Sequence, residues 1–447
     1  MAQKHKRRLT TNQVIAFSLL SVILTGSFLL MLPISSKAGA WTPFVDALFT
    51  ATSATCVTGL IVFDTYTHWT IFGQLVILFM IQIGGIGLMT LITSVFFFLK
   101  KSIDVPTRQI LQSSAGSLQL SGIARLIKRI LIGTAIFESL GAFSLATQFV
   151  PEMGWAKGIY YSVFHSVSAF CNAGFDIFGF KGEYVSLVPY SDNAVVSLTI
   201  CALIIIGGIG FIVWSDVLHH KEKLRYYSLH SQLVLTTTAF LLIAGTLSFY
   251  FLERNASMAG MTEHNRWLAS FFAATTPRTA GFNSIDINSM SQSGLLLTMI
   301  LMFIGGGAGS TAGGIKVTTF AVMILNLISS AAGHDIVTIF KRRLESDTFK
   351  QASSILSIYL IGFLTGTLLI CAFEPYSITE VAFECISGIG TVGLSTGLSQ
   401  QLKPFSLIIL SLLMYGGRLG GITFLMVFTK REKDPPLKRV SEKILLG

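Results

Sequence analysis

Thr55-Cys56-Val57-Thr58-Gly59 is the first of four glycine-bearing loops in this chain. The final glycines of the four loops are 115, 107 and 112 residues apart, and the other three loops are Phe170-Cys171-Asn172-Ala173-Gly174, Pro277-Arg278-Thr279-Ala280-Gly281 and Ile389-Gly390-Thr391-Val392-Gly393. A repeat of nearly constant period determines the architecture in which every other motif sits. The sequence therefore predicts four copies of one unit, at residues 1–105, 106–228, 229–345 and 346–447.

The composition is that of a membrane protein. Apolar residues make up 52% of the 447 residues, and charged residues only 12%. A helix needs roughly 20 apolar residues to cross a bilayer, and runs of that length occur along the whole chain. We therefore expect an all-α integral membrane protein with eight spanning segments: Gln13–Leu32, Gly73–Leu99, Leu126–Val150, Asn193–Val217, Gln232–Leu252, Gly294–Leu325, Ser354–Phe373 and Phe405–Phe428.

The distribution of lysine and arginine predicts the orientation. Of the 32 basic residues, 23 lie in the amino end, in residues 100–129, 216–230 and 334–353, and in the tail from Lys430. After eight crossings these five segments share one side, which the positive-inside rule makes the cytoplasm. We expect a multi-pass plasma-membrane protein with both termini in the cytoplasm. The rule also accounts for the net charge of +10, so the charge is weak evidence for nucleic acid binding.

Each glycine loop follows an apolar helix that is too short to span. These predicted half-helices are Pro43–Ala54, Gly158–Ala169, Asn265–Thr276 and Ile378–Gly388. Non-helical backbone at membrane depth is tolerated only where it lines water or is packed in protein. Each unit is therefore predicted to run as outer helix, half-helix, loop and inner helix, with the four units related by pseudo-fourfold symmetry around one central pore.

The loops suit a cation that must lose its water. A ring of backbone carbonyl oxygens can replace the hydration shell of potassium, and glycine permits the dihedral angles that turn these groups inward. The half-helices would aim their partially negative C-terminal ends at the cavity below. One such loop alone is better explained as a turn, but four in register favour an ion filter. The candidate filter residues are Val57, Thr58, Gly59, Asn172, Ala173, Gly174, Thr279, Ala280, Gly281, Thr391, Val392 and Gly393.

A second glycine motif lies deeper in each inner helix. In the first two units, at Gly84-Gly85 and Gly207-Gly208, we expect close helix packing or a kink. In the third unit the glycines expand into a run with very poor helix propensity, which should break the span beneath the filter. Such a loop could obstruct the permeation path and move to open it. The candidate gate residues are Gly305, Gly306, Gly307, Ala308, Gly309, Ser310, Thr311, Ala312, Gly313, Gly314 and Lys316.

Arg418 completes the candidate gate. Aligning Tyr415-Gly416-Gly417-Arg418 with the other inner helices puts Arg418 at the position of Ile86 and Ile209. A guanidinium inside the membrane is costly and needs carbonyls, carboxylates or water as partners. We expect Arg418 near the axis, beside the loop of residues 305–314, where it helps to hold the pore closed. A structural anchor that faces another helix is the alternative.

Other polar residues are weaker candidates. Asp46, Glu380, Glu384, Glu374 and Asp286 could raise the local cation concentration at the outer mouth, or they could be hydrogen-bonded structural residues. Glu138, inside an outer helix, is expected to pair within the bundle. We find no nucleophile and base set and no cluster of metal ligands, so an enzyme is not expected.

These features together resemble those of the Trk/Ktr/HKT superfamily of cation transporters, and most closely the bacterial Ktr-type membrane subunit. The resemblance covers essentially the whole chain and depends on the four filter glycines, the Gly/Ser/Thr run of the third unit and Arg418. It implies potassium uptake through a channel-like path, often stimulated by sodium. Some relatives have serine in the first filter loop and admit sodium, so Gly59 favours a preference for potassium.

The resemblance also implies partners. A homodimer and a cytoplasmic ring of nucleotide-binding regulatory subunits are expected, with ATP, ADP or NAD bound to that ring. No segment of this chain is predicted to form a soluble nucleotide-binding domain, so no cofactor is expected here and potassium is the transported ion. The basic segments Arg125–Arg129 and Lys341–Arg343 and the tail from Lys430 are the expected docking surfaces. Contact with anionic membrane lipids is the competing explanation.

A secondary symporter with alternating access is the alternative mechanism. It predicts inverted repeats and ionisable residues at a midplane site. The four units instead run in the same direction, and their loops offer backbone oxygens.

Overall fold

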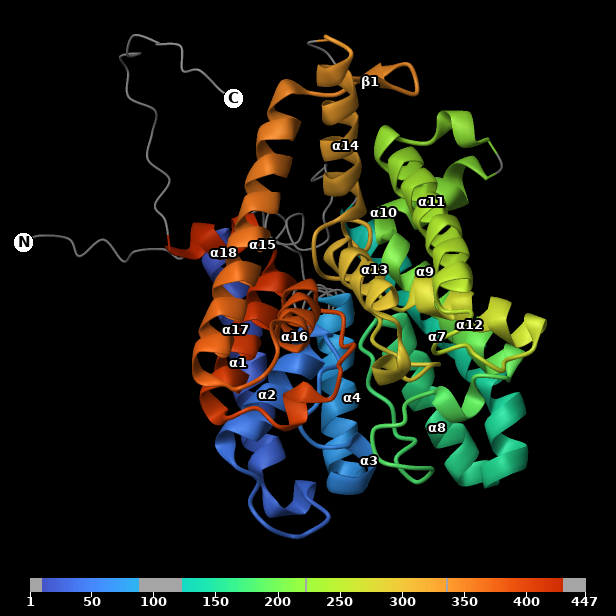
Figure 1. Cartoon of the computed structure of the whole chain (residues 1–447), viewed down its shortest axis with the longest axis vertical. Helices are drawn as coiled ribbons and strands as arrows, with labels where there is room; N and C mark the ends of the chain where they lie inside the picture. Colours follow the sequence, from blue (N-terminus) through green and yellow to red (C-terminus); the bar gives the residue numbers. More distant parts are fainter. Residues whose placement is uncertain (1–9, 88–122, 222, 335–336, 429–447) are drawn as a thin grey trace, which may run out of the picture.

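The chain folds into a bundle of helices that stand roughly along one direction (Figure 1). The computed structural model describes residues 10–87, 123–221, 223–334 and 337–428. The basic amino end, most of residues 100–129, the tail from Lys430 and the predicted boundary at residues 105 and 106 lie outside these ranges.

Long helices alternate with half-length ones along the chain. The long outer helices are α1 (Thr11–Met31), α7 (Ile123–Met153), α11 (Leu229–Leu252) and α15 (Ser346–Phe373). Each precedes a half-helix close to the predicted one: α2 (Phe44–Cys56), α8 (Trp155–Phe170), α12 (Glu263–Thr275) and α16 (Ile378–Gly390). Side chains cap several N-termini, such as Thr10 on α1, Ser228 on α11 and Ser377 on α16.

The inner helices are interrupted. The sequence predicts the break in the third unit, whereas the continuous spans predicted for the other three units are interrupted at Gly87, Gly210 and Gly420. After α4 (Ile71–Ile86) the chain takes a positive φ at Gly87. Gly210 and Gly420, also at positive φ, separate pairs of helices that are bent by 93° and 106°. The pairs are α9 (Ala194–Ile209) with α10 (Phe211–His220), and α17 (Pro404–Leu419) with α18 (Gly421–Phe428).

The third inner helix is broken by the predicted loop. It consists of α13 (Gln292–Phe303) and α14 (Val317–Ala331), with residues 304–316 between them. Ile304 and Ile315 form an isolated parallel bridge that closes the base of this loop. By length and composition, four described helices can cross a membrane, or six if each bent pair counts as one span. These four are the outer helices.

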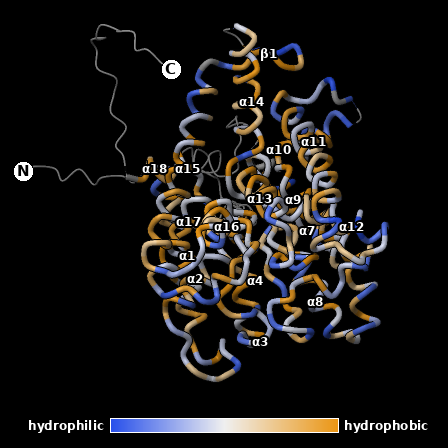
Figure 2. The backbone as a smooth tube through the Cα atoms, viewed as in Figure 1, coloured by the Kyte–Doolittle hydropathy of each residue, from blue (hydrophilic) through white to orange (hydrophobic). Residues whose placement is uncertain are grey.

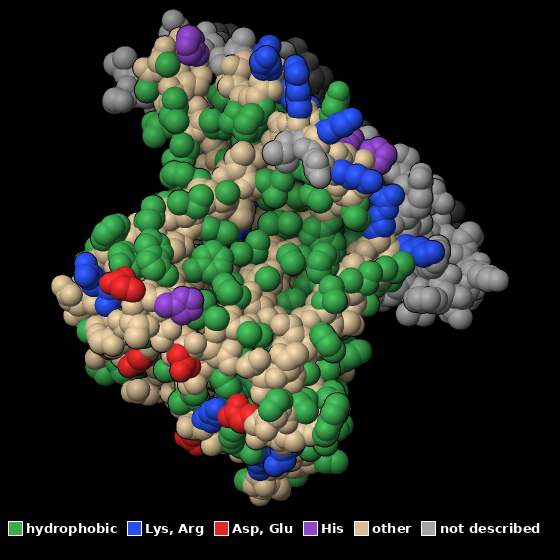
Figure 3. Space-filling view, turned by 90° about the vertical axis from the view of Figure 1, so that its right-hand side faces the viewer, with side chains coloured by type: hydrophobic (Ala, Val, Ile, Leu, Met, Phe, Trp, Pro, Cys, Tyr) green, Lys and Arg blue, Asp and Glu red, His purple; other side chains and the backbone are tan. Residues whose placement is uncertain are grey.

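The C-terminal parts of the half-helices are buried inside the bundle, and large apolar side chains cover its outside. In α2 every residue from Phe49 to Cys56 is buried, whereas Phe143 on α7 and Leu368 on α15 are more than 70% exposed. Figure 2 shows many hydrophobic residues, in orange, along the outer helices, and Figure 3 shows a broad apolar band across one face. Soluble proteins rarely expose contiguous apolar surface of this size, so the band indicates a lipid-facing surface.

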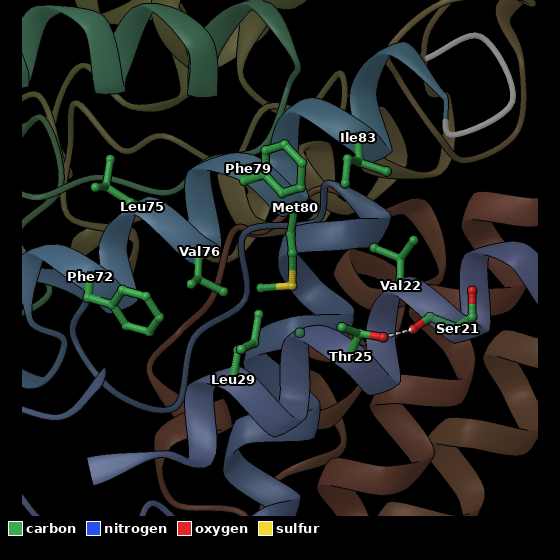
Figure 4. Close-up of a pocket in the computed structure, with 11 residues that line it drawn as sticks. Ser21, Val22, Thr25, Leu29, Phe72, Leu75, Val76, Phe79, Met80 and Ile83 are labelled. Carbon is green, nitrogen blue, oxygen red and sulfur yellow. Dashed lines mark hydrogen bonds between the residues drawn. The ribbon is translucent and has the colours of Figure 1, made fainter. Parts of the chain in front are cut away.

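Two features lie away from the glycine loops. A two-stranded hairpin of β1 (Thr338–Ile339) and β2 (Arg342–Arg343) precedes α15, which the all-α prediction did not include. An apolar pocket of about 440 Å³ lies between α1 and α4, lined by residues such as Val22, Leu29 and Met80 (Figure 4).

Candidate functional site

The four glycine loops share one backbone conformation. The residue two positions before each final glycine is in the left-handed region, with φ from 51° to 66°. The final glycine again has a positive φ, from 70° to 96°, and the residue between them does not. Alternation of this kind turns successive carbonyl groups toward the same side of the chain. The left-handed residues are Val57, Asn172, Thr279 and Thr391, and the glycines are Gly59, Gly174, Gly281 and Gly393.

The N–H groups of the loops point back to the half-helices. In the first loop, Thr58 N–H donates to the Ser53 carbonyl (2.8 Å) and Gly59 N–H donates to Ser53 Oγ (3.0 Å). Ser387 accepts from the fourth loop in the same way, with its carbonyl 2.8 Å from Val392 N and its Oγ 3.0 Å from Gly393 N. These donors are satisfied by the half-helices, and among the described hydrogen bonds none is accepted by the carbonyls of the candidate filter residues, which leaves those oxygens available to a ligand.

Sequence reasoning missed these serines. Ser53, Ser168 and Ser387 each stand six residues before a loop glycine, and this shared offset was the available signal. Ser168 differs in detail, since its carbonyl accepts from Ala173 N (2.8 Å) and its hydroxyl donates to the Phe175 carbonyl (2.7 Å). In the third unit Thr276 accepts from Ala280 N (3.0 Å), because Pro277 has no N–H and ends the helix earlier.

The four loops contact one another in a closed ring. A Cβ added to Gly59 would lie 2.5 Å from the Ala173 carbonyl oxygen, and one added to Gly174 would lie 2.7 Å from that of Ala280. A Cβ added to Gly281 would lie 2.5 Å from the Val392 carbonyl oxygen, and one added to Gly393 would clash with the Thr58 carbonyl oxygen, which closes the ring. Each glycine thus packs on the middle carbonyl of the next loop, where no side chain fits.

The inner helices approach the ends of the half-helices through glycine. A Cβ on Gly84, Gly207 or Gly417 would clash with the carbonyl oxygen of Thr55, Phe170 or Ile389, respectively, and each of these precedes its loop glycine by four residues. The helix then breaks three residues later, at Gly87, Gly210 and Gly420. This register corrects the sequence alignment, because Arg418 corresponds to Gly85 and Gly208 rather than to Ile86 and Ile209.

The loop of residues 304–316 lies against the second inner helix and the second glycine loop. Gly307 N–H donates to the Gly208 carbonyl (2.7 Å), and Phe211 N–H donates to the Gly309 carbonyl (2.8 Å). Thr311 Oγ1 is 3.1 Å from the Phe170 oxygen and 3.3 Å from Asn172 Oδ1. A Cβ on Gly313 would clash with Thr391 Oγ1, so the loop also contacts the fourth unit.

Arg418 bridges this loop to the first unit. Its Nη1 donates to the Thr311 carbonyl, and its Nη2 donates to the Gly84 carbonyl and, at 3.4 Å, to that of Gly85. Lys316 Nζ donates to the carbonyls of Ala312 (2.6 Å) and Gly313 (3.3 Å). Both cations are therefore held by backbone oxygens, one of the partner types that sequence reasoning expected for Arg418.

The buried carboxylates near the loops make hydrogen bonds within the protein. Glu384 is buried and accepts from Ser395 Oγ (2.5 Å) and Ser399 Oγ (2.6 Å). Glu374 accepts from Lys403 N and Ser406 Oγ, both at 3.0 Å, and so caps the start of α17. These contacts favour the structural alternative for both residues. Glu380 and Asp286 likewise cap short helical segments, and Asp46 lies in the first turn of α2.

Replacing Ser53 by alanine should destabilise the first loop. The Gly59 N–H would lose its acceptor, and an unsatisfied buried donor costs about 1–3 kcal/mol. We expect a lower thermal unfolding midpoint for the purified S53A protein than for wild type. The matched control is S27A in α1, because buried Ser27 only donates to the Ile23 carbonyl within its own helix. An S53A midpoint no lower than that of S27A would contradict the assigned bond.

Asp176 should make stability depend on pH. It lies in the segment after the second loop, and burial, with a smaller contribution from nearby Asp64, raises its pKa to about 7. The native carboxyl group then holds its proton more tightly than the unfolded chain, whose aspartate pKa is about 3.9, so stability falls as pH rises between these values.

D176N removes this dependence. The variant should have a higher unfolding midpoint than wild type at pH 8 and little difference at pH 4. D286N, at an exposed aspartate that caps a short turn, is the control. Equal pH profiles for wild type and D176N would contradict the shifted pKa.

The comparisons with known proteins agree over most of the chain. The family model TrkH, described as a cation transport protein, matches residues 2–437. The chain is 40% identical to the potassium/sodium uptake protein NtpJ of Enterococcus hirae, over all of this chain and 99% of that protein. It is 38% identical to Ktr system potassium uptake protein B of Bacillus subtilis, over 96% of this chain and 95% of that protein.

A solved structure shares the fold. The crystal structure of the potassium transporter TrkH from Vibrio parahaemolyticus superposes with a TM-score of 0.75, covering 96% of this chain and 87% of that one, at 17% identity. At this identity the likeness concerns the fold alone. The family model and the curated relatives, which span nearly the whole chain, show that it belongs to the TrkH family of cation transport proteins, a family of multi-pass membrane ion transporters.

Proposed function

We propose that this chain takes up potassium through a channel-like pore whose filter is the ring of four glycine loops. The single observation that carries the proposal is the closed ring of contacts between loops of one backbone conformation. Carbonyls from the twelve candidate residues, Val57–Gly59, 172–174, 279–281 and 391–393, would replace the water of a potassium ion. The relatives named above as potassium uptake proteins support this choice of ion.

The half-helices add an electrostatic contribution. α2, α8 and α16 end three or four residues before their loop glycines. The C-terminal end of a helix carries a partial negative charge of about half an elementary charge. Ends that converge below the filter would stabilise a cation there without any ionised side chain, which agrees with the carboxylates that are engaged in structural hydrogen bonds.

The gate in this proposal is the loop of residues 304–316 together with Arg418. The loop is held by hydrogen bonds to two other units, and Arg418 ties Thr311 to the end of α4. Its backbone contains glycines at positive φ, Gly309 and Gly314, which can change conformation at low cost. Release of the Arg418 contacts would let the loop move away from the filter.

The partner in this proposal is a cytoplasmic ring that binds ATP, ADP or NAD and regulates a homodimer of this chain. The word "system" in the name of the Bacillus subtilis relative supports a multicomponent transporter. The basic residues gather along the upper edge of the face in Figure 3, which we assign to the cytoplasm, together with both termini. The hairpin of β1 and β2, which carries the basic segment Lys341–Arg343, lies at this end, and Arg342 Nη1 donates to the Tyr227 carbonyl (3.0 Å).

A flux experiment tests the pore. Purified protein in vesicles should move rubidium, a potassium analogue, down its gradient in either direction, with sodium transported more slowly. Strict stoichiometric coupling to sodium or protons would instead support a symporter and overturn the proposal. Adding sodium at a fixed rubidium gradient measures sodium stimulation, and adding the purified regulatory ring with ATP or ADP measures regulation.

A further inference from the structure

A polar cluster lies behind the second glycine loop, within the membrane-spanning part of the bundle. Gln82 of α4 donates from Nε2 to Glu138 Oε2 of α7 (3.1 Å). Cys171, the residue before Asn172, donates its thiol to Gln82 Oε1 (3.5 Å), and its Sγ is 3.9 Å from Glu138 Oε1. Glu138 thus pairs within the bundle, as predicted, and its partners extend to the loop itself.

The backbone around this cluster is tightly packed. A Cβ on Gly85 would lie 2.5 Å from Cys171 Sγ, so the last turn of α4 rests directly on Cys171. Gln82 and Gly85 are three residues apart and share one face of the helix. Ser166 Oγ donates to the Glu138 carbonyl (2.6 Å) and fixes α7 to α8. Cys171 is therefore held between two helices from different units.

The same turn of α4 contacts Arg418. Gly84 and Gly85 carbonyls accept from Arg418, Arg418 donates to the Thr311 carbonyl, and Thr311 Oγ1 contacts the second loop at Phe170 and Asn172. The contacts form a closed circuit that runs from α4 to Arg418, to Thr311, to the second loop, and back through Cys171 to Gln82. Among the described hydrogen bonds, the second loop is the only one of the four loops that is bonded both to the candidate gate, through Asn172, and to this cluster, through Cys171.

We propose that Gln82 and Glu138 are positioning residues that set ion selectivity by holding Cys171, and with it the left-handed Asn172, in place. The inference rests on the proposed function, because it assumes that the second loop belongs to the filter. Gln82 uses both ends of its amide, one toward Glu138 and one toward Cys171. Loss of either contact lets the start of the loop shift and widens the ring. The wider ring raises sodium uptake by more than it lowers rubidium uptake.

The cluster affects selectivity by fixing the position of Cys171, and it does so through the acceptor oxygens of Glu138 and Gln82. E138Q keeps an oxygen for the Gln82 amide, whereas E138L removes it, and Q82L removes both contacts. A role through the negative charge of Glu138 would make E138Q as harmful as E138L. S144A is the matched control, since Ser144 also lies on α7 and shares a hydrogen bond with Thr199 (2.8 Å) away from the loops.

The experiment compares rubidium and sodium uptake by full-length protein in vesicles. Q82L and E138L should lower the rubidium-to-sodium ratio roughly 3- to 10-fold, the size expected for the loss of part-buried hydrogen bonds, while E138Q and S144A stay near wild type. C171S, which keeps a donor, should retain more selectivity than C171A. If E138L does not reach the membrane, Q82L and C171A decide the question.

The outcomes separate this inference from the proposed function. A wild-type protein without preference for rubidium over sodium would overturn both. A selective wild type with an unchanged ratio in Q82L and C171A would overturn the inference alone. Equal loss of selectivity in E138Q and E138L would replace the geometric role by one through charge and so refute the proposal as stated.

Discussion

G59S should lose most of the preference for rubidium over sodium. Gly59 has a φ of 96°, and a Cβ at this position would lie 2.5 Å from the Ala173 carbonyl oxygen. The added side chain forces the first and second loops apart, and the serine backbone is strained by about 1–3 kcal/mol in this conformation. Both effects act on the proposed filter ring. We expect the rubidium-to-sodium uptake ratio in vesicles to fall by about tenfold or more.

The control must carry the same backbone strain without the close contact. Gly260 has a φ of 81° and lies exposed in the segment between α11 and α12, and a Cβ added to it would have no atom within 4 Å. G260S should therefore keep wild-type selectivity. An unchanged ratio in G59S, or equal losses in the two variants, would remove Gly59 from the filter.

R418Q should raise uptake in the absence of any partner. Arg418 holds Thr311 and the end of α4 through charge-assisted hydrogen bonds, each worth about 1.5–3 kcal/mol. If the loop and Arg418 form the proposed gate, removing the charge weakens the closed arrangement, so the open fraction increases. If one such bond is lost, we expect basal rubidium flux to rise by roughly 10-fold or more. R418K should behave in an intermediate way, because lysine keeps the positive charge but lacks the forked, planar donors with which Arg418 reaches carbonyls on two different segments.

R129Q is the matched control for R418Q. Arg129 donates to Ser215 Oγ (3.0 Å) and is not bonded to the loop of residues 304–316 in the described structure. Its flux should equal that of wild type. If R418Q lowers flux together with the unfolding midpoint, Arg418 is a structural anchor and the gate assignment fails.

Sequence reasoning was most successful for the helices that carry one continuous pattern. The outer helices need only sustained apolar composition, which a window of about 20 residues detects. The half-helices were located because their glycine loops recur at constant spacing. The inner helices were predicted to be too long. Gly87, Gly210 and Gly420 lie within apolar runs, and the positive φ that ends the helix at each of them is a feature of the folded backbone.

In the candidate site, too, the sequence predicts which residues matter but not which atoms they contact. The loop residues and Arg418 stand out by composition, but the one-residue error in aligning Arg418 could not be detected among adjacent glycines. Gly417, rather than Gly416, matches Gly84 because it packs on a carbonyl four residues before the loop glycine. The hydrogen bonds of Ser53 and Ser387 likewise depend on contacts formed after the half-helix meets its loop.

The sequence by itself determined that this is a membrane protein, because hydrophobic length is a property of the chain alone, and the period of its four glycine loops predicts four similar units. Only the tertiary structure decided which atoms meet. The closed contact of Gly393 with Thr58 joins residues more than 300 positions apart, and Arg418 reaches Gly84 and Thr311 across three units. Such pairings depend on the packing of whole helices, which short-range propensity does not encode.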